Sequence, residues 1–143
     1  MIRSSESVEV ARTPDEVFAY VADIRNEPSW HDDIASVPPD TDAVPVAGKT
    51  YPVTFKPFMG KTAGEFRTVE VVPGSKVVHD ISLGGITPRV TYTVEASGNG
   101  ARFTRSVEMR PRGLMVVMTP MMAMMVPKRN KVYVANLKRV LER

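Results

Sequence analysis

Between Tyr51 and Met109 the sequence consists almost entirely of short strand-like segments joined by tight turns. The segments are YPVTFKPF, EFRTVEVV, KVVHDISL, RVTYTVEA and ARFTRSVEM. Most are rich in β-branched and aromatic residues, and the turns between the later ones contain PGS, GG and GNG. Loops this short can join only antiparallel neighbours, because a parallel connection needs a crossover of about a dozen residues or more. The sequence therefore predicts an antiparallel sheet.

The N-terminal region adds a strand and a well-marked helix. SVEVAR, residues 7–12, alternates sufficiently to be a strand, and TPDEVFAYVADI, residues 13–24, follows as a helix. Thr13 can cap this helix, Pro14 lies at its first position, and Glu16 completes a capping box. The start of the helix is thus predicted from three adjacent signals.

Two short elements and one long one complete the order. A short helix or turn is expected around residues 28–32, and IASV at residues 34–37 is expected to be an edge strand. The last element is predicted to be one helix from Leu114 to Glu142, interrupted by Pro120 and Pro127. Because each proline removes a backbone donor and crowds the preceding turn, the helix should bend.

Together these elements place the chain in the α+β class. A curved sheet wrapped around the terminal helix buries the apolar faces of both. With 143 residues, 43% hydrophobic and 24% charged, the chain has the size and balance of one globular domain, residues 1–143. It contains no Cys, which excludes disulfides, thiolate metal sites and cysteine nucleophiles.

Charge and hydrophobicity argue against several partners and locations. The net charge is +3, much of it near the C-terminus in PKRNK and LKRVLER, and basic residues do not alternate with aromatic ones. We therefore expect no nucleic-acid binding. No segment reaches the roughly 20 apolar residues of a membrane span, and the first residues lack the apolar run of a signal peptide. A cytoplasmic protein without a membrane span is predicted.

The sequence resembles the START-like superfamily (SRPBCC), and within it the polyketide cyclase/dehydrase and lipid-transport family. The segments behind this resemblance are TPDEVFAYVADIRNEPSW, VEVVPGSKVV, YTVEASGNGARFTRSVEM and the ending GLMVVMTPMM…LKRVLER, which together span nearly the whole chain. The resemblance implies a helix-grip fold: a curved seven-stranded antiparallel sheet around a long C-terminal helix, two short helices after the first strand, and a hydrophobic cavity. It implies ligand binding rather than a particular reaction, since relatives include both carriers and aromatase/cyclase enzymes.

The stretch NEPSWHDDI contains the only tryptophan, Trp30, beside a histidine and two aspartates. The resemblance implies that Trp30 packs the second helix against the sheet. His31, Asp32 and Asp33 are consecutive, so on a helix they fan out by about 100° per residue and do not converge on one metal ion. We expect solvated loop residues here; the alternative is that His31 and Asp33 act as a general base on a ligand in the cavity.

The short turns also predict which strand residues point inward. If the GG turn at residues 84–85 is a two-residue loop, His79 opposes Val90, and the SGNG turn then makes Tyr92 oppose Arg105. The face predicted to point inward comprises Val77, His79, Ile81, Val90, Tyr92, Val94, Phe103, Arg105 and Val107. The opposite face, with Asp80, Glu95 and Glu108 among its members, is the solvated one.

Arg105 is the most informative residue of the inward face. A buried guanidinium needs a carboxylate, a phenol, backbone oxygens, solvent or an anionic ligand. One hypothesis is that Arg105 and Tyr92 orient the polar end of an apolar ligand, with His79 as a second donor or proton acceptor. The other is that Arg105 reaches a cavity mouth and pairs with an acidic neighbour, while His79 is a satisfied interior histidine.

Methionines form the other predicted wall. Six of the nine lie between Met115 and Met125, and thioether side chains repack around irregular apolar shapes. They form either a ligand surface or ordinary core, and the outer side of this segment is a candidate for a homodimer contact or for ligand entry near Pro120. The predicted ligand-binding residues are His79, Val90, Tyr92, Phe103, Arg105, Met118, Met122 and Met125.

The leading hypothesis is a protein that binds or transports a hydrophobic small molecule or lipid. The first alternative is a polyketide cyclase/aromatase-type enzyme, which can act by holding its substrate in one conformation. The second is an interaction module whose exposed methionine surface, including Met121 and Met124, binds a protein or a membrane. The sequence identifies no catalytic residue, no metal site and no cofactor, so the leading hypothesis names only a hydrophobic ligand as partner.

Overall fold

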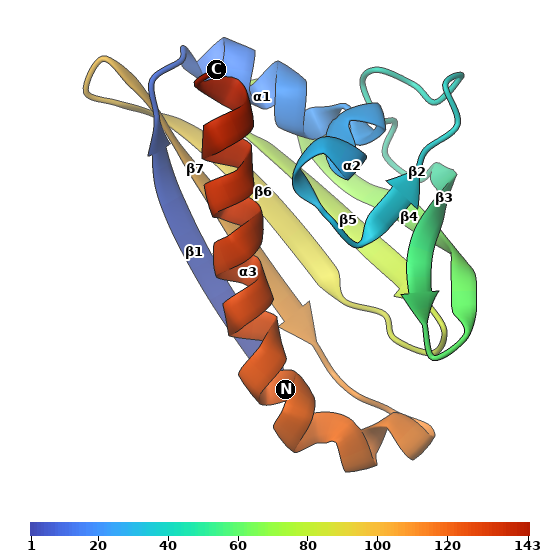
Figure 1. Ribbon diagram of the computed structural model, residues 1–143. Coiled ribbons are helices and arrows are strands. Elements are labelled where there is room, and N and C mark those ends of the chain that lie inside the picture. Colours follow the sequence, from blue (N-terminus) through green and yellow to red (C-terminus); the bar gives the residue numbers. More distant parts are fainter.

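The computed structural model describes residues 1–143 as a curled antiparallel sheet of seven strands with a long helix across one face (Figure 1). The strand order is β1-β7-β6-β5-β4-β3-β2. The strands are β1 (Ile2–Val10), β2 (Ile34–Ser36), β3 (Thr50–Phe58), β4 (Lys61–Val72), β5 (Lys76–Leu83), β6 (Arg89–Ser97) and β7 (Gly100–Met109). The helices are α1 (Pro14–Ala22), the 3-10 helix η1 (Ile24–Asn26), α2 (Glu27–Trp30), the 3-10 helix η2 (Gly113–Met118) and α3 (Thr119–Leu141). The predicted α+β class and helix-grip architecture are confirmed.

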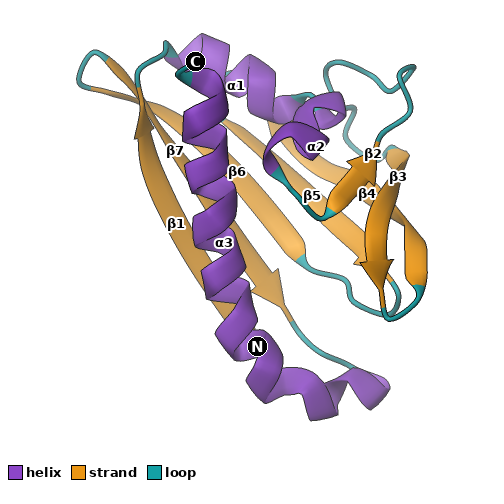
Figure 2. Cartoon of the chain, viewed as in Figure 1, coloured by secondary structure: helices purple, strands orange, loops and turns teal.

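All the helices lie on one side of the sheet (Figure 2). Helix α1 begins as predicted, because the Thr13 side chain accepts from the backbone N–H of Glu16 and the Glu16 carboxylate accepts from that of Thr13. The predicted edge strand is also present as β2, which pairs only with β3. The first strand is longer than predicted, because residues 2–6 also pair with β7.

The C-terminal helix differs from the prediction at its start. Residues 113–118 form the 3-10 helix η2, and Pro120 lies at the beginning of α3 instead of interrupting a longer helix. A proline is well accommodated there, since its missing N–H would have no partner within the helix. Pro127 does lie inside α3, and the helix continues through it. None of the helices combines the length and hydrophobicity that crossing a bilayer requires.

The predicted strand registers are confirmed. His79 pairs with Val90, and Tyr92 pairs with Arg105. Every residue of the predicted inward face is buried: Val77, His79, Ile81, Val90, Tyr92, Val94, Phe103, Arg105 and Val107. Val78 on the opposite face is buried as well, so the two faces do not separate completely at β5.

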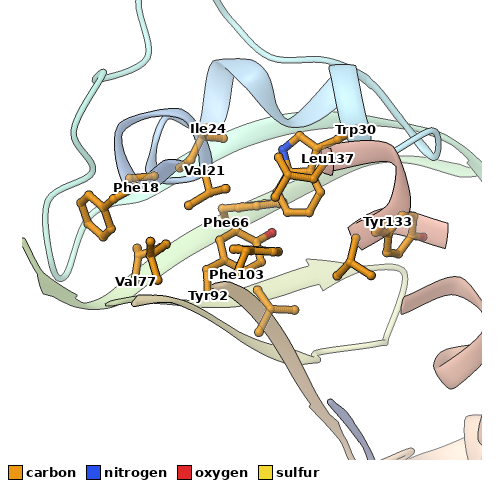
Figure 3. Packing of buried hydrophobic residues seen from close by; sticks show 14 of the residues in the cluster. Phe18, Val21, Ile24, Trp30, Phe66, Val77, Tyr92, Phe103, Tyr133 and Leu137 are labelled. Carbon is orange, nitrogen blue, oxygen red and sulfur yellow. The ribbon is translucent and has the colours of Figure 1, made fainter. Parts of the chain in front are cut away.

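Trp30 holds the short helix α2 against the sheet, as the resemblance implied. Its ring is 1% exposed, and it meets Phe103 edge-on at a centroid distance of 5.7 Å and Tyr92 at 5.3 Å. Figure 3 shows it above these two residues and beside Leu137 of α3. Trp30 thus belongs to the hydrophobic cluster that joins the helices to the sheet.

We predict that Trp30→Ala lowers the free energy of unfolding by about 3–5 kcal/mol, because it leaves a large cavity between α2, α3 and the sheet. Trp30→Phe should cost much less, because the buried indole N–H has no acceptor to lose. Urea denaturation followed by circular dichroism measures both. Val44→Ala, at an exposed loop residue, is the control; a Trp30→Ala loss as small as that of the control would refute this structural role.

Candidate functional site

A cavity of about 220 Å³ lies between the first half of α3 and the sheet. Fifteen of its twenty lining residues are hydrophobic, so its wall is mainly apolar. On the sheet side they include Phe55, Phe66, Ile81, Val90 and Val107, and on the helix side Met121, Met122, Met125 and Val126. The polar lining residues are His31, Asp33, Arg105 and Arg129, joined by the phenol of Tyr133. The cavity thus has an apolar wall with a small polar group beside it.

Arg105 of β7 is the central residue of that polar group. It is 6% exposed, and its Nε donates to Nε2 of His31 at 3.2 Å while Nη1 donates to Oδ1 of Asn130 at 2.9 Å. The guanidinium also lies over the ring of Tyr133, 4.7 Å from its centroid. No carboxylate lies within ion-pairing distance of Arg105, so it is held by neutral partners and an aromatic face.

Behind Arg105, away from the cavity, a second buried layer begins at Glu27. This residue is fully buried at the start of α2, and its carboxyl group contacts Nδ1 of His31, one helical turn later. The hydroxyl of Tyr92 donates to the same carboxyl group at 3.0 Å. Because Nε2 of His31 accepts from Arg105, its ring proton resides on Nδ1, facing Glu27. His31 therefore lies between the arginine and the acid: Nε2 accepts from Arg105, while Nδ1 contacts the Glu27 carboxyl group but has no hydrogen-bond partner.

Burial shifts the protonation of these groups toward their neutral forms. It raises the pKa of Glu27 to about 8, although the charge of Arg105 and the bond from Tyr92 oppose the shift. Burial, helped by the nearby charge of Arg105, holds the pKa of His31 well below its usual value. At neutral pH both side chains are thus mainly uncharged, and the positive charge of Arg105 has no full counter-charge beside it.

Asp33 and Tyr133 form the outer part of the polar group. The Tyr133 hydroxyl donates to Oδ2 of Asp33 at 2.7 Å, and both residues line the cavity. Burial and the charge of Asp33 raise the pKa of Tyr133 above its ordinary value. Arg129 pairs with Asp32 and also lies over the Tyr133 ring, 5.0 Å from the centroid. This outer layer joins the segment after α2 to α3.

The structure brings only some of the predicted ligand residues to the cavity. Arg105, Val90, Met122 and Met125 line it. Tyr92 and Phe103 lie in the packed core beneath Trp30, as Figure 3 shows. Met118, at the end of η2, is also absent from the lining.

His79 is buried outside the cavity lining too. Its Nδ1 lies 3.2 Å from the Thr68 hydroxyl, while Nε2 has no hydrogen-bond partner. Burial lowers the pKa of His79 to about 4, so the ring is neutral at pH 7. It is an interior histidine, but only one of its nitrogens is satisfied.

Three residues of the polar group were missed or misjudged from the sequence. His31 was expected in a solvated loop, and this expectation was wrong: the ring is 3% exposed, because it packs between Trp30 and Tyr133. Glu27 and Asn130 were not considered at all. The spacing of Glu27 and His31, four residues apart, was a usable signal, since such residues face one another on a helix. Asn130 lies in a run of charged residues that conceals it.

No group of three or more His, Asp or Glu side chains is placed to hold a metal ion. Arg105 also lacks the acidic neighbour that one of the two hypotheses required. Chemically, the apolar wall can contact an apolar molecule, and the charge of Arg105 can interact with a polar end of that molecule.

Comparison with known proteins agrees with the fold described above. The sequence model of the family described as "Polyketide cyclase / dehydrase and lipid transport" matches residues 1–142. No curated protein matches the chain.

Several solved structures share the fold at low sequence identity. A protein from Chromobacterium violaceum and a START superfamily protein from Mycobacterium smegmatis each superpose with a TM-score of 0.74 at 16% identity. The first match covers 99% of this chain and 97% of the other, and the second 98% and 97%. The Aha1 dimer from Colwellia psychrerythraea gives a TM-score of 0.67 at 16% identity over 99% and 97% of the two chains.

The shifted pKa values predict a stability maximum near pH 6.5. The folded-state pKa values of His31 and His79 lie below the unfolded value, so the stability that they contribute is lost as the pH falls below about 6.5. The folded-state pKa of Glu27 lies above its unfolded value, so its contribution is lost as the pH rises toward 8. The free energy of unfolding should fall by about 1–2 kcal/mol between pH 6.5 and 8.

Glu27→Gln should remove this alkaline decline, because an amide does not titrate. Urea denaturation between pH 5.5 and 8.5 compares it with wild type and with Glu65→Gln, an exposed acid on β4. The same alkaline decline in wild type and Glu27→Gln would contradict the assignment to Glu27.

Proposed function

Because the chain belongs to the polyketide cyclase / dehydrase and lipid transport family, we propose that it binds a hydrophobic small molecule or lipid in the cavity beneath α3. The observation that supports this most directly is the cavity itself: a mainly apolar wall with a buried, unpaired Arg105 beside it. An apolar pocket with few convergent polar groups is the usual form of a small-molecule site.

The polar group favours a ligand with an acidic or strongly polar head. A guanidinium has five N–H donors, and His31 and Asn130 use two of those on Arg105. Since Glu27 is mainly protonated at neutral pH, the remaining donors and the net positive charge can serve a carboxylate or a similar group. The apolar part of the ligand would extend from Arg105 along the strands toward Met122.

The volume sets the size of the ligand. About 220 Å³ is the space of roughly seven waters, below the roughly 300 Å³ at which typical ligand pockets begin. A larger ligand would need the wall to move, and the methionines are suited to this because their side chains repack at little cost. Met121 and Met125 are exposed at 40% and 44%, so their movement would open the cavity to the outside.

An enzyme of the cyclase/aromatase type is the second candidate, and one observation favours it. Tyr133 and Asp33 form a hydrogen-bonded acid–base pair on the cavity wall, next to the positive charge of Arg105. His31 is less suited to act as a base, because Nε2, its one acceptor nitrogen, already accepts from Arg105. Tyr133→Phe separates the candidates: a ligand recovered from this variant that differs in mass from the one recovered from wild type would indicate a reaction.

Native mass spectrometry of protein purified from its own host tests the binding function directly. We expect a retained small molecule that is released on denaturation and identified by its mass. Recovery of ligand-free protein from several preparations would count against a carrier.

We further predict that Arg105→Met weakens binding of cis-parinaric acid about tenfold or more while leaving its methyl ester little changed, because a bond to a charged group contributes about 1.5–3 kcal/mol. Fluorescence titration measures both affinities, and ester binding also shows that the cavity is intact. Arg67→Met, at an exposed arginine outside the cavity lining, is the matched control. Equal loss of acid and ester, or loss of neither, would refute the role of Arg105 as a head-group ligand.

A further inference from the structure

The 3-10 helix η2 and the first turns of α3 expose an unusual amount of apolar surface. No residue of η2 is buried, and Leu114 and Val117 are 90% and 83% exposed. Met124, on α3, is 70% exposed. In Figure 1 this segment extends past the end of the sheet, away from α1 and α2. An exposed apolar patch of this kind is typical of a surface that contacts a partner.

Every charged residue within this segment is basic. Residues 109–141 contain seven Lys or Arg and no Asp or Glu, whereas the whole chain has 19 basic and 16 acidic residues. Arg110 and Arg112 precede the apolar segment, and Lys128 and Lys131 follow it. All four are exposed, and none of them forms a salt bridge within the chain.

We propose that residues 110–131 dock the protein on an anionic membrane surface, with Leu114, Val117 and Met124 inserted at the lipid interface. Apolar side chains flanked by cations suit such an interface, because the apolar groups enter the acyl boundary while Lys and Arg contact anionic headgroups. The segment is too short to span a bilayer, and docking requires only that it lie on the surface.

A second copy of the chain is a poorer partner for this surface. In a two-fold symmetric dimer the same patch meets itself, which brings the four unpaired cations of one copy toward those of the other. The segment itself contains no acidic residue that could pair with these cations across the two-fold axis. An anionic membrane carries the charge opposite to that of the segment, so electrostatic complementarity favours a lipid surface over a second copy of the chain.

The docking segment is also part of the cavity wall. Met121 and Met125 line the cavity, while Met124 between them faces outward. Membrane contact would therefore be made by the same turns of α3 that separate the cavity from the outside. The docking proposal itself does not require the cavity to be occupied, and it is tested without a cavity ligand.

Vesicle co-sedimentation tests the proposal with the full chain. We expect binding to vesicles of equal parts phosphatidylcholine and phosphatidylglycerol at low salt, and little binding to phosphatidylcholine alone. Leu114→Glu combined with Val117→Glu should lower the partition coefficient by at least about tenfold, because each change removes apolar burial and adds a repelled charge. Both sites are largely exposed, so the variant should fold normally; thermal denaturation checks this. Val44→Glu combined with Val46→Glu adds the same charge at exposed loop valines and is the matched control.

A second pair of variants tests the charge separately. Lys128→Gln combined with Lys131→Gln should weaken binding to the anionic vesicles by about tenfold. Arg139→Gln combined with Arg143→Gln removes the same charge near the far end of α3 and should have a much smaller effect. No wild-type binding to anionic vesicles, or equal binding by all variants, would overturn the proposal. If wild type formed dimers that dissociated in the Leu114→Glu/Val117→Glu variant, and wild type did not bind vesicles, the surface would instead be an interface with a second copy of the chain.

Discussion

The buried guanidinium of Arg105 is the constraint on which the polar side of this interior depends. A charge in an apolar interior must be surrounded by donors, acceptors or aromatic faces, and here these come from separate elements: His31 after α2, and Asn130 and Tyr133 from α3. Asn130 in turn donates to the backbone carbonyl of Arg105 and to Ser4 of β1. One strand residue thereby fixes the segment after α2 and the middle of α3 relative to the sheet.

This arrangement explains why the interior is solid at one end and open at the other. On the α1 side of the Arg105 group, Trp30, Phe103 and Leu137 fill the space between helices and sheet (Figure 3). On the other side the helical surface consists of methionines and small residues, and the cavity lies between it and the strands. The polar group lies at the boundary between the packed core and the cavity. Its members are hydrogen-bonded to one another, so their side chains do not move into the cavity to fill it.

The sheet was predictable from sequence because its turns are short. A two-residue loop fixes register, and register fixes the face of every residue, so His79, Tyr92 and Arg105 could be placed inward before the structure was known. No such rule relates a helix to a strand that is distant in sequence. Glu27 and Asn130 were therefore missed, and only the closed fold brings Glu27 to Tyr92, 65 residues away. Pro120 was misjudged for a local reason: the same residue can interrupt a helix or begin one, and the sequence around it is apolar in both cases.

The two halves of the C-terminal segment differ in composition, and packing against the sheet explains only the second half. Residues 132–141 include Tyr133, Val134 and Leu137, which are buried against the sheet and its core, so packing accounts for them. Residues 110–131 are apolar and basic, and Arg129, which pairs with Asp32, is the one basic residue among them with an acidic partner. Apart from Met122 and Asn130, no residue of this range is buried, so packing does not explain this composition. A segment selected only for folding would carry polar residues at sites as exposed as Leu114 and Val117. The apolar side chains at these sites are better explained by contact with an apolar phase outside the protein, at the same end of the molecule as the methionine wall of the cavity.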